Sequence, residues 1–184
     1  MTTIYFVRHA ESDINIRDGE SRPLTEKGLK DAKNIIPLFR EIEIDRVYSS
    51  PYKRAVDTVS PLANIRKLEI EVIDDFKERR SDTVKSVELS ELIKRQWDDF
   101  TYTLSDGECY SDVQSRNIKA LARVLSENEG GTVVIGTHGI SLCTMIHFYH
   151  PISLKNLGRI LLTMPYIARM RFDGGRFVDF EELL

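Results

Sequence analysis

The chain of 184 residues is 41% hydrophobic, a size and composition with which one domain can bury a core without disulfides or metals. Its 26 basic and 29 acidic side chains leave a formal net charge of −3, which excludes the positive field that gathers nucleic acid or an anionic membrane. Arg8 interrupts the first apolar run and no later window matches a membrane's thickness, so we expect neither a signal peptide nor a membrane span. With Cys109 and Cys143 expected as free thiols, we expect a single cytoplasmic domain over residues 1–184.

The first predicted elements are a strand and a helix. Residues 4–7 form a short apolar run that ends in a polar cluster, which is typical of a buried central strand. Thr25 is the predicted N-cap of the helix, and Pro37 predicts a kink or break in it. The core-facing residues of this helix are expected at helical spacing, and they are Leu29, Ala32, Ile36 and Phe39.

A strand, a helix and another strand are predicted next. Residues 46–49 indicate the second strand, and Ser50 and Pro51 are the expected N-cap and first residue of the helix after it. Alternating polarity over residues 68–72 predicts a third, more exposed strand. Beyond it we expect one or two helical segments, lined by Val84, Val87, Leu92, Trp97 and Phe100.

The last third of the chain continues the alternation of helices and strands. Ser111 and Gln114 have the capping-box spacing and predict a helix that ends at Gly130. A buried strand over 132–136 leads to a helix from about 140 to 149, which Pro151 terminates. The remaining expected elements are strands over 160–164 and 167–172, and a hairpin turn at Asp173 and Gly174 before 176–178.

This order of elements predicts an α/β fold. We expect a three-layer sandwich whose central sheet is mostly parallel, with helices on both faces and antiparallel strands at the C-terminal end. Ligands of such sheets bind beyond the carboxyl ends of the strands.

Chemically active side chains follow the predicted central strands directly. The first strand runs into Arg8 and His9, the strand over 132–136 runs into His138, and Arg54 lies one turn inside the helix after the second strand. Parallel packing would bring these groups to one crevice. Fixed arginines suit the charge of a phosphoryl group in transfer, and a neutral imidazole can attack phosphorus to form a covalent intermediate. No glycine-rich phosphate loop and no Cys-x5-Arg cradle offers another mechanism.

Four segments in order resemble the histidine phosphatase superfamily, also called phosphoglycerate mutase-like. They are Arg8-His9-Ala10-Glu11 with Asn15, Arg22-Pro23-Leu24-Thr25-Glu26-Lys27-Gly28, Ser49-Ser50-Pro51 with Arg54 and Thr58, and Thr137-His138-Gly139. The resemblance implies that His9 is the phosphorylated nucleophile and that Arg8, Arg54 and His138 bind the phosphoryl group. It also implies a carboxylic acid that protonates the leaving oxygen, at the position of Glu78. The residues that match substrate-binding positions are Asn15, Ser21, Arg22 and Gly139.

Two departures from the family pattern bear on these assignments. Ala10 stands where a glycine commonly follows the nucleophile. The residues after Glu78 lack the Gly-x-x-Glu-Gly pattern, which leaves Asp74, Asp75 and Asp82 as competing acids. The segment 106–108 resembles the Gly-Glu-Ser segment that precedes a helix in relatives, with Cys109 in place of serine.

The resemblance implies a metal-independent phosphomonoester hydrolase without a cofactor. Cys143, His147 and His150 fall at helical spacings, but a zinc site normally needs three or four convergent ligands and only one helix supplies these, so we expect no metal site. A small phosphorylated metabolite is the expected partner and a phosphoprotein the alternative, with no nucleic acid or membrane, while the oligomeric state stays open. A phosphoglycerate-type mutase and a catalytically weak phosphate-binding module are the competing functions. Mutases of the family are implied to carry larger insertions that exclude water, which favours hydrolysis here.

Overall fold

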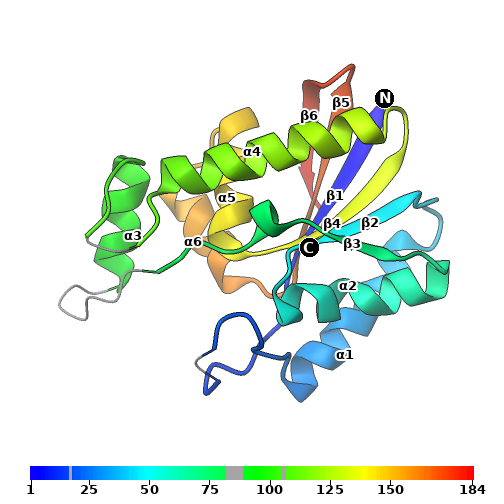
Figure 1. Cartoon of the computed structure of the whole chain (residues 1–184), viewed down its shortest axis with the longest axis horizontal. Coiled ribbons are helices and arrows are strands. Elements are labelled where there is room, and N and C mark those ends of the chain that lie inside the picture. Colours follow the sequence, from blue (N-terminus) through cyan, green and yellow to red (C-terminus); the bar gives the residue numbers. More distant parts are fainter. Residues whose placement is uncertain (17, 82–88, 105–106) are drawn as a thin grey trace.

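The computed structural model describes residues 1–16, 18–81, 89–104 and 107–184. Its centre is a sheet of the strand order β3-β2-β4-β1-β5-β6, which is six-stranded over these residues (Figure 1). The parallel part consists of β1 (Thr2–Arg8), β2 (Arg46–Ser49), β3 (Ile70–Val72) and β4 (Thr132–Thr137). The antiparallel part consists of β5 (Tyr166–Asp173) and β6 (Arg176–Glu182). The predicted α/β class, with a mostly parallel sheet and antiparallel C-terminal strands, is confirmed.

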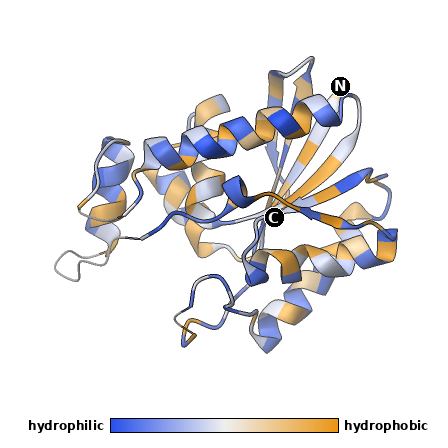
Figure 2. Ribbon diagram, viewed as in Figure 1, coloured by the Kyte–Doolittle hydropathy of each residue, from blue (hydrophilic) through white to orange (hydrophobic). Residues whose placement is uncertain are grey.

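The central strands β1 and β4 are buried on both faces, which explains their unbroken apolar runs. Ile4 and Phe6 pack in one hydrophobic cluster, with residues of α4 (Tyr110–Glu127), α5 (Gly139–Tyr149) and α6 (Leu154–Leu162). Tyr5 and Val7 pack on the opposite face, against residues of α2 (Lys53–Arg66) and of the chain after α1 (Glu26–Asn34). Helices therefore cover both faces of the sheet, and the expected three layers are confirmed (Figures 1 and 2).

The break predicted at Pro37 is confirmed, because α1 ends at Asn34 and a 3-10 helix, η1 (Ile36–Phe39), follows. Thr25 caps α1 as predicted, its hydroxyl accepting the N–H of Gly28 at 3.0 Å. The prediction that Leu29 faces the core is wrong, since it is 50% exposed. Within α1 the buried positions are Gly28 and Ala32, and after the change of helix type at Asn34 the buried positions are Ile35 and Phe39, with Ile36 only half-buried.

Two predicted helix starts are wrong. Helix α2 begins after Tyr52 and not at Pro51, because the hydroxyl of the buried Ser50 is engaged elsewhere and caps no helix. Helix α4 begins after Cys109, so Ser111 lies inside its first turn. The Gln114 side chain instead contacts α5, where its amide nitrogen donates to the carbonyl of Thr144 at 2.8 Å.

The strand predicted over 160–164 is wrong, because residues 154–162 form α6. The Ser153 hydroxyl caps this helix by accepting the N–H of Asn156, and Leu157 and Ile160 face the core one turn apart. The helix predicted from about 140 to 149 is confirmed as α5, and the hairpin turn is confirmed at Gly174 and Gly175, which both have positive φ.

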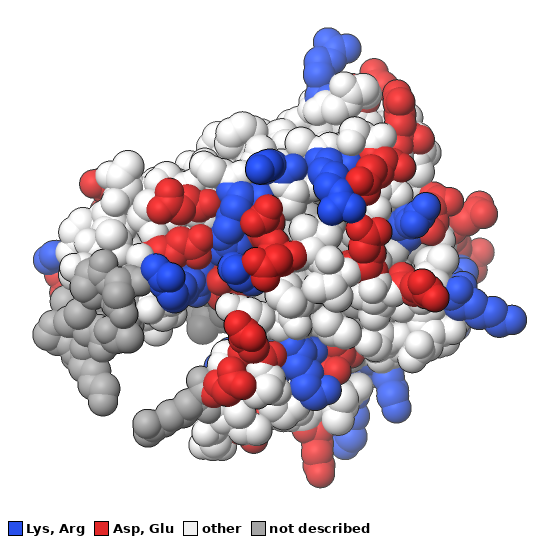
Figure 3. All heavy atoms as spheres, viewed as in Figure 1, with Lys and Arg blue, Asp and Glu red and all other residues white. Residues whose placement is uncertain are grey.

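The segment after β3 contains a short 3-10 helix, η2 (Asp74–Phe76), and then α3 (Leu89–Asp98). Val84 and Val87, expected to line a helix, lie outside the described residues, as does Asp82. Across the part of the chain that is described, no helix combines the length and hydropathy needed to cross a membrane. Acidic and basic side chains are interspersed over the face seen in Figure 3, as the small net charge predicts.

Candidate active site

His9 stands directly after β1, and its side chain is held in one protonation pattern. Its Nδ1 lies 2.7 Å from the carbonyl oxygen of Ala10, which can only accept a hydrogen bond. Burial is the largest of the causes that lower the pKa of His9 to about 3, and the neighbouring cations Arg54, Arg8 and Arg22 contribute to the same shift. The ring is therefore neutral at pH 7, with its hydrogen on Nδ1 and a free lone pair on Nε2. That is the state in which an imidazole acts as a nucleophile.

His138 follows β4, the parallel neighbour of β1, and the register pairs Arg8 with Thr137. The rings of His9 and His138 consequently lie side by side, with centroids 5.4 Å apart. His138 is fully buried, and this burial, together with the charge of Arg54, holds its pKa well below the ordinary value. Its Nε2 lies 2.7 Å from the Ser50 hydroxyl, while its Nδ1 has no hydrogen-bond partner among the described residues.

Arg8, the last residue of β1, is anchored by the end of α6. Its Nη1 donates to the carbonyls of Ile160 and Thr163 at 2.7 and 2.8 Å, which leaves Nε without a partner in the described chain. Gly139 makes room for this guanidinium. A Cβ at Gly139 would lie 2.7 Å from Cδ2 of Leu161 and 3.3 Å from the Arg8 Nε.

Arg54 lies in the first turn of α2 and is 3% exposed. Its Nη1 donates to the carbonyl of Gly19, and its guanidinium carbon lies 4.9 Å from the centroid of the Tyr52 ring. Burial and the nearby Arg22 lower the pKa of Arg54 to about 10, so this side chain remains cationic at neutral pH.

Of these side chains, Arg8, His9 and Arg54 border a cavity of about 600 Å³. It is lined by Arg8, His9, Glu11, Ser12, Asp13, Ile14, Asn15, Arg22, Thr25, Arg54, Glu78 and Met164. Within the described residues, the buried Nε–H groups of Arg8, Arg22 and Arg54 have no acceptor, and the buried Nδ1 of His138 has no hydrogen-bond partner. Buried N–H groups without partners are costly, and a small anion with several oxygens would satisfy these.

Glu78 lies on the wall of the same cavity and is held by backbone amides. Its Oε2 accepts the N–H of Ile140 and its Oε1 that of Ser141, each at 3.1 Å, at the N-terminus of α5. Oε1 also accepts the N–H of Arg79 at 2.9 Å. Thus α5, which His138 precedes, also holds Glu78 in place.

The competing acids lie elsewhere. The carboxylate of Asp74 pairs with Lys77 at 2.6 Å, and its side chain is 71% exposed. Asp75 lines a second cavity of about 440 Å³, which adjoins the first through Glu78. Of the described candidates for the acid, Glu78 alone lines the cavity of His9.

The expected substrate-binding residues divide into two groups. Asn15 and Arg22 line the cavity, and Asn15 donates from both its backbone and its side-chain nitrogen to Asp13. Ser21 is exposed, outside the cavity wall, and donates to the carboxylate of Asp18 at 2.6 Å. Gly139 packs against Arg8 and is not part of the wall.

Two residues that were not predicted as site residues help to position the site. The Thr58 hydroxyl accepts the N–H of Ala10 at 3.0 Å and donates to the carbonyl of Arg54 at 2.7 Å. Ser50 contacts His138 as described above. The sequence position of Thr58 could have indicated this role, because a residue four positions after Arg54 lies on the same face of the helix.

Arg116 braces the segment that carries Glu78. It makes two bonds to the carboxylate of Glu108, at 2.7 and 2.9 Å, and its Nη1 donates to the carbonyls of Asp75 and Lys77. The Arg116 guanidinium overcomes the effect of burial and lowers the pKa of Glu108, which is therefore a carboxylate at neutral pH.

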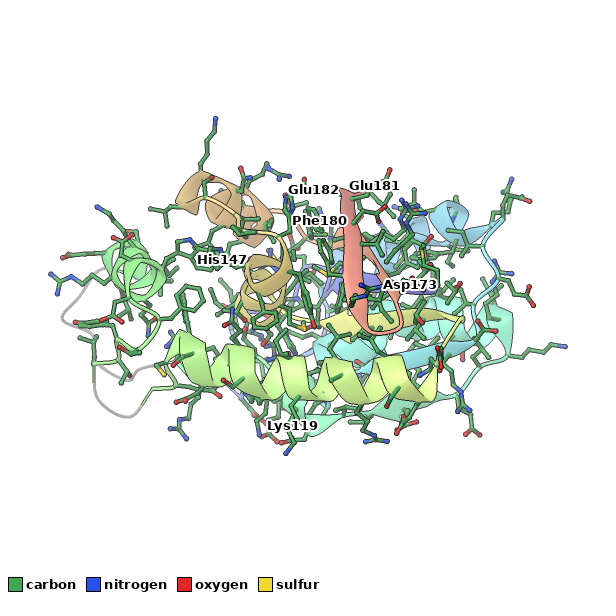
Figure 4. The ribbon with its side chains drawn as sticks, turned by 90° about the horizontal axis from the view of Figure 1, so that it is seen from above. Lys119, His147, Asp173, Phe180, Glu181 and Glu182 are labelled. Carbon is green, nitrogen blue, oxygen red and sulfur yellow. The ribbon has the colours of Figure 1, made fainter. Side chains whose placement is uncertain are left out.

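The described residues contain no group of three or more His, Cys, Asp or Glu side chains placed to hold a metal ion. Two of the residues considered as ligands, His147 on α5 and His150 directly after it, pack against aromatic rings. His147 packs edge-on against Trp97, with ring centroids 4.9 Å apart, and His150 stacks on Phe180, which Figure 4 shows on β6.

A model of the histidine phosphatase superfamily (branch 1) matches residues 4–179. The chain therefore belongs to the histidine phosphatase superfamily, as the motifs around His9 and His138 indicated.

Relatives with different names are similar to this chain. The uncharacterized phosphatase PhoE of Bacillus subtilis is 28% identical over 150 residues, covering 79% of this chain and 76% of that protein. The 2,3-bisphosphoglycerate-dependent phosphoglycerate mutase of Thermoplasma acidophilum is 27% identical over 195 residues, covering 88% of this chain and 91% of that protein. Among solved structures, Bacillus stearothermophilus YhfR has a TM-score of 0.79 at 27% identity, over 97% of this chain and 95% of that one.

Proposed function

We propose that this chain is a metal-independent phosphomonoester hydrolase that forms a covalent phosphohistidine on His9. One observation carries the proposal. A neutral His9 with a free Nε2 lone pair lines the same cavity as Arg8, Arg22 and Arg54, whose buried Nε–H groups have no acceptor among the described residues, and the His138 ring with its unpartnered Nδ1 lies beside His9. This arrangement combines a nucleophile with donors for the charge on the equatorial phosphoryl oxygens.

In the first step, Nε2 of His9 attacks phosphorus and the bond from phosphorus to the leaving oxygen breaks. Glu78 gives that oxygen a proton, so the product leaves as a neutral alcohol and Glu78 becomes a carboxylate. The guanidinium groups of Arg8 and Arg54 and the ring N–H of His138 hold the phosphoryl oxygens throughout.

In the second step, a water molecule attacks the phosphohistidine. The Glu78 carboxylate takes a proton from that water, the bond from phosphorus to Nε2 breaks, and inorganic phosphate leaves. His9 returns to its neutral state and Glu78 is protonated again. The two steps therefore need one carboxyl group that alternates between acid and base.

A small phosphorylated metabolite is the substrate class that we propose, since the cavity of about 600 Å³ has the size of ordinary small-molecule sites. Transfer to a second hydroxyl of the bound product, as in a mutase, is the competing outcome. Chain length does not separate the two, because the Thermoplasma mutase is matched over 91% of its length by 88% of this chain.

The test is a panel of phosphomonoesters assayed with and without EDTA, for wild type, His9→Ala and Glu78→Gln. We expect little effect of EDTA, no turnover by His9→Ala, and the largest loss by Glu78→Gln on substrates with poor leaving groups. Product analysis with 3-phosphoglycerate distinguishes released phosphate from 2-phosphoglycerate.

Rapid quench and intact-mass measurement should reveal an acid-labile phosphoenzyme that is absent from His9→Ala. Vanadate binding without hydrolysis of any panel member would instead identify a phosphate-binding module. Turnover without a phosphorylated His9 would overturn the mechanism.

A further inference from the structure

Ser50 connects β2 to α2 and is completely buried. Its hydroxyl oxygen lies 2.7 Å from Nε2 of His138 and accepts the N–H of Tyr52 at 3.2 Å. Because the Tyr52 amide can only donate, the single Ser50 hydroxyl hydrogen remains available for His138.

The hydrogen between Ser50 and His138 has two possible positions. If Nε2 of His138 donated to Ser50, the Ser50 hydroxyl hydrogen would have no acceptor among the described residues, and Nδ1 would be a bare, buried lone pair. If Ser50 donates to Nε2, both atoms of that contact are satisfied and Nδ1 carries the ring hydrogen. With Nε2 as the donor, two groups remain without a partner. With Ser50 as the donor, only the Nδ1–H of His138 remains, and it is free to donate to a ligand.

We propose that Ser50 is a positioning residue that fixes the tautomer of His138, so that Nδ1–H donates to a phosphoryl oxygen. Donation to an anion rests on the proposed function; the tautomer itself does not. The opposite tautomer would direct a lone pair at the oxygens of the same anion.

Both strand-end histidines then have the hydrogen on Nδ1 but use the ring in opposite ways. His9 directs this hydrogen to the carbonyl of Ala10 and keeps Nε2 free to attack. His138 receives the Ser50 hydrogen on Nε2 and keeps Nδ1–H for the anion. Two neutral imidazoles of one tautomer thus supply a nucleophile and a hydrogen-bond donor.

The protein contains a histidine of the other tautomer as an internal reference. Nδ1 of His147 on α5 (Figure 4) accepts the N–H of Ile152 at 3.2 Å, so a neutral His147 carries its hydrogen on Nε2. In protein labelled with 15N-histidine, two-bond proton–nitrogen spectra distinguish these tautomers. The signals are assigned with His138→Asn and His147→Gln.

We expect the spectra of the substrate-free wild type to show Nδ1–H for His138 and Nε2–H for His147. An Nε2–H signal for His138 would overturn the inference, whatever the protein hydrolyses. This measurement needs no turnover and no variant of Ser50, so a failure of the proposed function would not be mistaken for a failure of the tautomer assignment.

Substitution of Ser50 tests the consequence for anion binding. In Ser50→Ala, His138 should lose its single tautomer, and inorganic phosphate should bind about tenfold more weakly by calorimetry, as expected for the loss of a hydrogen bond to a charged group. Ser50→Thr keeps the hydroxyl and should restore both properties.

Ser49→Ala is the matched control. Its hydroxyl is as buried as that of Ser50 but has no hydrogen-bond partner among the described residues, so its removal should change neither the His138 spectrum nor phosphate binding. An unchanged tautomer in Ser50→Ala, or equal losses in Ser49→Ala and Ser50→Ala, would show that Ser50 does not set the tautomer of His138.

Discussion

The hydroxyl of Thr58 lies 3.0 Å from the backbone nitrogen of Ala10 and joins helix α2 to the residue that follows the nucleophile. The same hydroxyl donates to the carbonyl of Arg54 at 2.7 Å. Ala10 in turn holds Nδ1 of His9 through its carbonyl. The position of the His9 ring therefore depends on a threonine that does not line the cavity.

Replacement of Thr58 by valine keeps the shape of the side chain but leaves the buried Ala10 N–H without an acceptor. We expect a loss of stability of about 1–3 kcal/mol, the usual range for an unsatisfied buried polar group. Phosphoenzyme formation in rapid quench should slow at least tenfold, because His9 loses its fixed orientation. Thr58→Ser keeps the hydroxyl and should remain close to wild type in both measurements. Equal rates for the valine and serine variants would contradict this role.

Acid should destabilise the fold in part through His9. Its pKa is about 3 in the folded chain, against an ordinary value of 6.5, so between these values the unfolded chain binds a proton that the folded chain does not. This contribution to stability is complete above pH 6.5 and is lost as the pH falls to about 3.

His9→Asn removes this titration while keeping a donor for the Ala10 carbonyl. Its free energy of unfolding should vary less with pH than that of wild type between about pH 6.5 and 3, as measured by urea denaturation at several pH values. The exposed His150 provides the control variant His150→Gln, which should follow wild type. Parallel curves for wild type and His9→Asn would show that His9 is not a buried neutral ring.

Gly139→Ala should impair the phosphate site by displacing Arg8. The new Cβ would lie 2.7 Å from Leu161 and 3.3 Å from the guanidinium, so at least one of these side chains must move. We expect kcat/KM to fall at least tenfold and the melting temperature to decrease.

The matched control is Gly158→Ala in α6, where a Cβ meets nothing within 4 Å. This change should raise stability by about 0.5–1 kcal/mol, the difference in helix propensity between the two residues, without changing kcat/KM. Full activity of Gly139→Ala would show that Arg8 does not need this space.

Arg116→Lys should weaken the support of Glu78. Lysine cannot reproduce the bidentate contact with Glu108 together with the bonds to the carbonyls of Asp75 and Lys77. We expect kcat to fall several-fold, most on substrates with poor leaving groups. Arg123→Lys alters an exposed ion pair with Glu127 and should leave the kinetics unchanged. A uniform loss across all leaving groups would show that Arg116 does not act through Glu78.

The sequence predicted the sheet well because β1 and β4 are apolar on both faces, a pattern that does not depend on distant contacts. It failed at 160–164, where a short apolar run fits a strand as well as a helix. There the Ser153 cap and the burial of Leu157 and Ile160 against the core stabilise a helix.

In the site, the proximity of His9 and His138 was predicted from the packing expected of parallel strands. The long-range hydrogen bonds around the two rings could not be predicted, since Ser50 and His138 are 88 positions apart and Ala10 and Thr58 are 48 apart. Ser21, expected to bind substrate, does not line the cavity, and its exposed hydroxyl donates to Asp18.

The start of α5 has one more consequence. His138 immediately precedes this helix, and the N–H groups of Ile140 and Ser141 hold Glu78. Any tilt of α5 would disturb the anion donor and the acid together, so the two cannot be tuned separately from this side. Adaptation to a new leaving group, natural or engineered, is therefore expected to begin at wall residues outside α5, such as Asp13, Ile14 and Asn15.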